Sequence, residues 1–487
     1  MPSPSLPRAT VFAALAMAFA TAAQAQTDRA SGDAQTIEAL TRRLEALELR
    51  NGIDASAGSV QASGEAPGIA ELDQRLRVLE RKLELQAEEA AARAANEPVV
   101  ALSAAKGLSV KSPASDGVEL KFKGLVQADS RFFLDDDAQR QNDGFLLRRA
   151  EPTVEGSWGP LLGFRIQAQL AGDSATINDA NLDIRFDPRA TLRIGKFKAP
   201  FGLEQLQSSS GLAAIERGLP SELTPARDYG LQLQGEAGNN TLAYAVGVFN
   251  GTVDGRDGTA GNPDNELELV GRVFWEPWKN DANALSGLGF GIAGSSGDKR
   301  GSGNNALPRY RTPGQAQFFG YRSDVLADGD HLRWSPQAYW YRNAFGLLGE
   351  YVSSKQEVAL TDGARAELDH RAWQLSASLV LTGEDASYRG VARPNQPFTG
   401  DGAGWGAFEV VGRYGRLDVD DAAFPLFADP ASAASAATAW GLGLNWYLTG
   451  NLKLVANYTQ ARFDGGSADG ADREDEKAFF TRAQFSF

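Results

Sequence analysis

The sequence contains no cysteine and only two histidines in 487 residues. No disulfide and no thiolate metal site can therefore form. His331 and His370 both lie in polar, loop-like sequence, and neither has a partner at metal-ligand spacing or a convincing serine or acidic pair for hydrolysis. We therefore expect no metal site, no cofactor and no enzymatic activity.

Long apolar runs are also missing after the first 25 residues, so no membrane-spanning helix is expected there. Acidic residues outnumber basic ones and give a formal net charge of −14. This charge argues against a nucleic-acid partner, because the phosphate backbone repels such a surface. If the chain crosses a membrane, it must do so as a β-barrel, which satisfies every backbone group within the sheet.

Residues 1–25 have the layout of a cleavable signal peptide. They carry Arg8, an apolar run over 11–20, and the small-residue site formed by Ala23, Gln24 and Ala25. The apolar run is too short to span a bilayer. The mature, secreted chain is expected to begin at Gln26.

Residues 26–93 follow a helical period. Apolar residues recur at steps of three and four within 36–50 and again within 69–86, surrounded by charges, and this pattern predicts a coiled coil. A flexible joint is expected at 51–68, which is rich in glycine, alanine and serine and contains Pro67. One amphipathic helix packed on a barrel is the alternative. Residues 94–117 read as a linker.

From residue 118 to 487 the period changes to two. Val118, Leu120 and Phe122 alternate with Glu119 and Lys121, as in a strand with one apolar and one polar face. Sixteen such segments are predicted, at 118–129, 146–158, 164–170, 182–186, 191–197, 227–236, 242–249, 267–275, 287–294, 332–342, 345–352, 372–382, 405–417, 440–448, 451–462 and 476–487. An even number of strands of about ten residues is typical of an outer-membrane barrel that contacts lipid.

The predicted connections alternate between short and long, as expected if short turns face the periplasm and long loops face outward. Both ends of the barrel would then lie in the periplasm. The segment 383–404 is long where a short turn is expected. The predicted fold class is thus all-β: a sixteen-stranded antiparallel transmembrane β-barrel preceded by a short α-helical coiled-coil segment. A soluble β-sandwich would not need this alternation.

Several stretches resemble the phosphate-selective porin O and P family of Gram-negative outer membranes. They are FKGLVQADSRFF (122–133), FLLRRAEPTVEGSW (145–158), RIGKFKAPFGLEQLQSS (193–209), IERGLPSEL (215–223), LTGE (381–384), WGAFEVVGRY (405–414) and LGLNWYLTGNLKLVANYT (442–459). The resemblance implies a sixteen-stranded barrel, usually trimeric, whose third outer loop folds into the lumen. Here that loop is 198–226.

The resemblance also implies an anion path. Its guanidinium groups would come from Arg148, Arg149, Arg217, Arg309 and Arg311. The constriction would include Asp179, with Gln205 and Ser210 where phosphate-selecting members place lysines, and with Lys196 and Lys198 as possible substitutes. Arg148 and Arg149 fall on opposite faces of a regular strand, so both can face water only if the strand has a bulge.

Other predicted lumen charges are mixed in sign, so the sequence supports a pore more strongly than phosphate selectivity. The leading prediction is passive diffusion of small anions, such as inorganic phosphate, resembling phosphate and polyphosphate channels. One alternative is a weakly selective porin for other small solutes. The other is a structural protein whose coiled coil contacts the cell wall or a periplasmic partner.

Overall fold

The computed structural model describes residues 38–39, 41–43, 69–96, 98–103, 107–113, 117–135, 141–259, 261–301, 306–361 and 363–487. The chain divides into two compact units, residues 1–97 and 98–487. The predicted signal peptide at 1–25 and the predicted joint at 51–68 lie outside the described residues, as does most of the first heptad segment at 36–50.

The first unit contains one long described helix, α3 (Ile69–Asn96). Leu76 is buried, Leu79 and Leu83 are half-buried, and Val78 is exposed. These leucines follow the predicted heptad spacing and form one narrow apolar stripe along the helix. No helix in the described part of the chain is long and apolar enough to cross a membrane.

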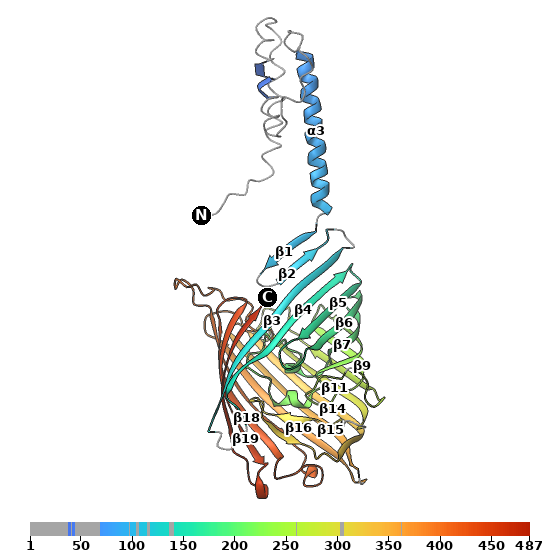
Figure 1. Ribbon diagram of the computed structural model, residues 1–487, viewed down its shortest axis with the longest axis vertical. Helices are drawn as coiled ribbons and strands as arrows, with labels where there is room; N and C mark the ends of the chain where they lie inside the picture. The colour runs from blue at the N-terminus through green and yellow to red at the C-terminus, as the bar shows by residue number, and fades with distance from the viewer. Residues whose placement is uncertain are drawn as a thin grey trace. The chain divides into compact units, whose positions relative to one another are not determined.

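The second unit is built around a closed barrel of sixteen antiparallel strands in its described residues, which confirms the predicted fold (Figure 1). Each strand pairs with the next along the chain, and β20 pairs with β3 to close the sheet. The strands are β3 (Val118–Leu134), β4 (Gly144–Trp158), β5 (Leu162–Gln169), β6 (Thr176–Asp187), β7 (Ala190–Lys198), β8 (Arg227–Ala237), β9 (Leu242–Phe249), β10 (Glu268–Trp275), β11 (Leu288–Arg300), β14 (Val325–Arg342), β15 (Phe345–Leu360), β16 (Arg365–Val380), β17 (Ala407–Asp418), β18 (Ala434–Tyr447), β19 (Leu452–Gly465) and β20 (Glu476–Ser486).

Several strands are longer than predicted. Among them, β14, β15 and β16 begin or end well beyond 332–342, 345–352 and 372–382. The two histidines therefore lie in strands and not in loops. His331 Nε2 is 3.0 Å from Ser354 Oγ, and His370 Nε2 is 2.7 Å from Tyr321 Oη. Both rings are buried, and these hydrogen bonds join them to other side chains of the protein.

The segment 94–117, expected to be a linker, instead contains the end of α3 and a β-hairpin of β1 (Val99–Ser103) and β2 (Gly107–Lys111). β2 continues the barrel sheet by pairing with the start of β3. The chain terminus pairs with β3 beside it, since Gly124 and Phe487 exchange backbone hydrogen bonds of 3.0 and 3.1 Å. The hairpin and the terminal strand thus share β3 as a neighbour.

The apolar core of this unit lies inside the lumen, where inward-folded loops meet the wall. The fifth outer loop carries a small hairpin of β12 (Arg309–Arg311) and β13 (Gln317–Gly320). Tyr310, Phe318 and Phe319 from this loop pack in one cluster with Phe201 and Leu223 of the third loop. The packed loops therefore narrow the lumen in the outer half of the barrel.

Candidate functional site

The third outer loop is held rigidly across the lumen by buried carboxylates. It contains the short helix α4 (Leu203–Leu206) and the 3-10 helix η2 (Leu219–Leu223). Glu350 of β15 accepts hydrogen bonds from the backbone N–H groups of Leu203 and Glu204 at the start of α4. Glu204 in turn accepts from the Gly218 N–H at 2.7 Å and lies 3.2 Å from Arg413 Nη1. Both ends of the loop are thereby tied to the wall.

Two of the predicted cations shape this loop from within. Lys198 Nζ donates to the carbonyls of Gln205 and Gln207, at 2.8 and 2.6 Å. Arg217 donates to the carbonyls of Glu204 and Gln207, at 3.2 and 2.9 Å. These carbonyls are at the end of α4, where a helix leaves acceptors without partners. Lys198 and Arg217 therefore cap the helix, and the side chain of Gln205 is buried beneath them.

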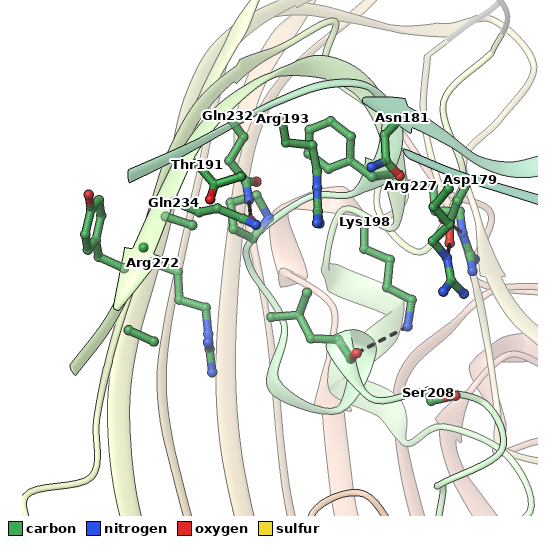
Figure 2. A pocket seen from close by; sticks show the side chains of 18 of the residues that line it. Asp179, Asn181, Thr191, Arg193, Lys198, Ser208, Arg227, Gln232, Gln234 and Arg272 are labelled. Carbon is green, nitrogen blue, oxygen red and sulfur yellow. Dashed lines mark hydrogen bonds and ion pairs between the residues drawn. The ribbon is translucent and has the colours of Figure 1, made fainter. Parts of the chain in front are cut away.

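A cavity of about 640 Å³ lies between the third loop and the wall formed by β4 to β10. Figure 2 shows Arg193, Arg227 and Arg272 reaching into it, with Lys198 beside the loop. Its charged lining residues are five cations and three acids: Arg165, Arg193, Lys198, Arg227, Arg272, Glu151, Asp179 and Glu236. The cavity is thus net positive although the whole chain is strongly negative.

Most of these cations already have partners. Asp179 lies 3.0 Å from Arg165 Nε and 2.8 Å from Arg227 Nε, so it joins two arginines of the cavity. Arg193 makes a bidentate pair with Asp183 at 2.7 and 2.9 Å. Arg272 differs, because its Nε donates to the neutral amide of Gln337 at 2.9 Å and no described carboxylate lies within ion-pair distance of it.

Arg148 and Arg149 meet on the inner side of the wall because β4 has a bulge. Arg149 pairs with Gln127 of β3 and Leu147 pairs with Ala128, which leaves Arg148 as the extra residue. Both guanidinium groups then approach Glu216 of the third loop. Arg148 Nε lies 2.7 Å from a Glu216 carboxylate oxygen, and Arg149 Nη2 lies 3.9 Å from the other.

Arg309 and Arg311 are exposed on β12, at the outer side of the third loop. The Arg311 N–H donates to Glu222 at 2.9 Å, and the Arg309 carbonyl accepts from Arg256 Nη2 at 2.6 Å. Partial desolvation of the Arg311 guanidinium, with the positive charges of Arg256, Arg148 and Arg309, lowers its pKa. Burial lowers the pKa of Arg217, with contributions from Arg227 and Arg148. The positive charge of Arg148 therefore acts both on Arg217 of the third loop and on Arg311 of the fifth.

A family model described as phosphate-selective porin O and P matches residues 120–487, which is most of the chain. The chain belongs to this family. It is accordingly an outer-membrane porin, as its resemblance implied. The family and the barrel fold both point to a channel.

Porin O of Pseudomonas aeruginosa is 26% identical to this porin over 427 residues, which cover 80% of this chain and 92% of the relative. Among solved structures, the outer membrane channel DcaP of Acinetobacter baumannii aligns with a TM-score of 0.50 at 12% identity, covering 76% of this chain and 97% of that one. An anion-selective porin from Comamonas acidovorans aligns with a TM-score of 0.48 at 13% identity, covering 76% of this chain and 100% of that one.

The remaining predicted positions of the porin lie apart from the cavity. Lys196 is not among the residues that line it, and its ammonium group lies 5.3 Å from the ring centroid of Tyr229. Ser210 Oγ is 2.9 Å from Ser208 Oγ, while the Ser210 carbonyl accepts from Gln484 at 3.1 Å. Ser208, and not Ser210, lines the cavity.

Sequence reasoning missed Lys453, which contacts the third loop of the porin, and Glu216, which belongs to that loop. Lys453 of β19 donates to the Leu212 carbonyl at 3.1 Å, so a lysine reaches this loop from the wall and not from the loop itself. Glu216 binds the arginines of β4. Its position beside Arg217 in the segment ERGLPSEL was the available signal, since an acid next to an expected anion-path arginine can neutralise it.

A second cavity of about 510 Å³ adjoins the first and shares Leu206, Glu236, Ala243 and Arg272 with it. Its lining includes Tyr388 from the long connection between β16 and β17, which folds into the lumen. The Tyr388 hydroxyl donates to the Leu203 carbonyl, and its ring stacks on Tyr339 at 5.1 Å. The third loop of the porin is thus contacted from the other end of the barrel as well.

Proposed function

We propose that this porin passes small anions, including inorganic phosphate, by passive diffusion. The observation that supports this most directly is the sign of the charge along the cavity beside the third loop, where five cationic side chains line the walls with three acids. The chain as a whole carries a net charge of −14. A positive lining inside a negative molecule concentrates the field where a solute must pass, and it lowers the barrier for anions.

Arg272 is the cation of this cavity that we expect to contact permeating anions most strongly. Arg165, Arg193 and Arg227 are already paired with carboxylates, and Lys198 with carbonyls. Arg272 has only a neutral partner and lies where the two cavities meet. Because most of the other cations are neutralised, binding of any single anion should be weak and conduction fast.

The replacement Arg272→Ala tests this proposal. Anion over cation preference, measured from reversal potentials across a potassium chloride gradient near 0.1 M, is expected to fall about threefold, because low salt leaves the charge of Arg272 largely unscreened. The matched control is Arg189→Ala, which removes an exposed arginine that is paired with Asp187 and does not line the cavity. Cation preference in the wild-type porin would refute the proposal, and equal effects of the two replacements would remove Arg272 from the path.

A weakly selective porin for other small solutes is the second candidate. It is favoured by the pairing of Asp179 and Asp183 with three of the cavity arginines, which lowers the net charge that a solute meets. Repeating the reversal-potential measurement with added phosphate separates the two candidates. An anion preference that phosphate leaves unchanged, together with no phosphate block of the chloride current, would support the weakly selective porin.

We further propose that the porin assembles as a homotrimer and that residues 26–93 form a periplasmic coiled coil. The support is the apolar stripe of Leu76, Leu79 and Leu83 on α3. A stripe this narrow is suited to packing against another helix, as in a coiled coil. A contact with the cell wall or another periplasmic partner is the alternative use of the same helix.

A further inference from the structure

Glu216 lies at the centre of a buried arginine cluster that connects the third loop to the wall. Arg148 approaches it in a bidentate arrangement, with Nε at 2.7 Å and Nη2 at 3.0 Å from the two carboxylate oxygens. Further guanidinium groups surround the same carboxylate, namely those of Arg482 at 2.8 Å, Arg131 at 3.4 Å and Arg149 at 3.9 Å. One loop carboxylate therefore contacts four arginines.

The cluster stays positive after Glu216 is counted. Its other contacting acids are Asp129 and Glu151. Asp129 is bidentate to Arg482 at 2.6 and 2.8 Å and lies 3.2 Å from Arg131, and Glu151 lies 3.8 Å from Arg149 Nε. Four guanidinium groups thus meet three carboxylates. Burial alone would raise the pKa of Glu216, but Arg148, Arg149 and Arg482 hold that pKa well below its usual value. Glu216 is accordingly a permanent negative charge at physiological pH.

The contacts of Glu216 are those that a bound phosphate would make. Guanidinium groups bind carboxylate and phosphate through the same parallel pair of N–H donors, so the two anions compete for one arrangement. The side chain of Glu216 is only 3% exposed, whereas that of Arg148 is 27% exposed. Part of the Arg148 side chain is therefore accessible to solvent, while its paired N–H donors are occupied by Glu216.

We propose that Glu216 is a tethered counter-anion that occupies the phosphate-binding face of Arg148 and thereby keeps the affinity of the path for phosphate low. This inference rests on the proposed anion permeation. A permeating phosphate must share Arg148 with Glu216, so it binds weakly and leaves quickly, which conduction requires. The strength of phosphate binding is then set by an acid of the third loop, and not only by the number of cations along the path.

The replacement Glu216→Gln tests the inference in the full-length porin reconstituted in planar bilayers. The amide keeps the size and an acceptor for the loop contact but removes the charge that competes with phosphate. Half-block of the chloride current is expected at about tenfold lower inorganic phosphate, because a charged hydrogen-bond pair on Arg148 becomes available to it. Glu216→Asp withdraws the carboxylate by one methylene and is expected to give a smaller shift in the same direction.

The matched control is Glu204→Gln. Glu204 is also a buried carboxylate of the third loop, and it lies 3.2 Å from Arg413, so its loss weakens the loop anchor without freeing Arg148. Phosphate block in this control should stay within about twofold of wild type. The double variant Glu216→Gln with Arg148→Ala should lose the gain, since the vacated site is then absent.

Equal shifts in Glu216→Gln and Glu204→Gln would overturn the inference, because loop loosening would then explain both. An unchanged half-block in both Glu216→Gln and Glu216→Asp would also overturn it. Neither result bears on anion permeation itself, which the wild-type reversal potential decides separately.

Discussion

Glu222 is an acid of the third loop whose charge depends on pH near neutrality. Its carboxylate accepts from the Arg311 N–H at 2.9 Å and lies 3.9 Å from Arg256 Nη1. Burial raises the pKa of Glu222 to about 7, although Arg256 and Arg311 act in the opposite direction. Glu222 therefore loses its negative charge as pH falls through this value, while the neighbouring arginines remain charged.

Acidification from pH 8 to pH 6 should consequently increase anion preference by about twofold. Protonation of Glu222 removes one negative charge from beside Arg256 and Arg311, so the net charge there becomes more positive. Glu222→Gln should show the low-pH preference at both pH values in reversal-potential measurements. Glu367→Gln, which removes an exposed acid paired with Lys355, should keep the wild-type pH dependence. A pH response that survives in Glu222→Gln would assign it to another group.

At this scale the family resemblance singled out Arg148 and Arg149, but the sequence did not predict what they contact. Strict alternation along a strand separates Arg148 from Arg149, and the bulge that brings both to Glu216 depends on the register between β3 and β4. The contact between Arg148 and Glu216 joins residues 68 positions apart. Neither strand period nor local composition carries information about such a pairing.

At the scale of elements, period-two alternation identified every barrel strand, because one face meets lipid and the other the lumen. It missed the outer parts of β15 and β16 for a physical reason. Val358 is buried in the loop core inside the lumen, whereas Lys355 and Glu357 project to the other side of β15. The apolar and polar faces are exchanged there, so the sequence resembles a polar loop.

The connection between β16 and β17 supports the third loop across the lumen. Tyr388 donates its hydroxyl to the Leu203 carbonyl, stacks on Tyr339, and accepts at its own carbonyl from Gln207 Nε2 at 2.7 Å. The ring contact and the hydroxyl hydrogen bond together contribute about 2 kcal/mol to the position of the loop. The third loop is thus fixed from two directions.

Tyr388→Ala should therefore raise single-channel conductance and current noise, because the third loop fluctuates more when this support is removed. Recordings in symmetrical potassium chloride measure both quantities. Tyr244→Ala is the matched control, since Tyr244 lines the first cavity as Tyr388 lines the second, but it donates its hydroxyl to the Arg189 carbonyl at a turn and not to the third loop. Quiet, wild-type-like recordings from Tyr388→Ala would show that the loop needs no such support.

For the whole molecule, the residues that line the two cavities and those proposed to determine assembly occupy different parts of the chain. All residues lining the two described cavities lie between positions 151 and 389, within the barrel unit. The stripe of Leu76, Leu79 and Leu83 belongs to α3 in the other unit. The barrel was predictable because its pattern repeats in every strand, whereas the lumen depends on single contacts between loops that are far apart in the sequence. Function and assembly should consequently be separable by mutation.

The double replacement Leu79→Asp with Leu83→Asp places two charges in the apolar stripe of α3 without touching the barrel. If three copies of α3 pack through this stripe, the temperature at which trimers dissociate in detergent should fall by several degrees, because each buried apolar side chain contributes about 1.5–3 kcal/mol. Gel mobility after graded heating measures this temperature.

Val78→Asp is the matched control, since Val78 is exposed on the same helix. Conductance and anion preference should remain at wild-type values in both variants. Unchanged trimer stability in the double variant would instead assign the stripe to a periplasmic or cell-wall partner.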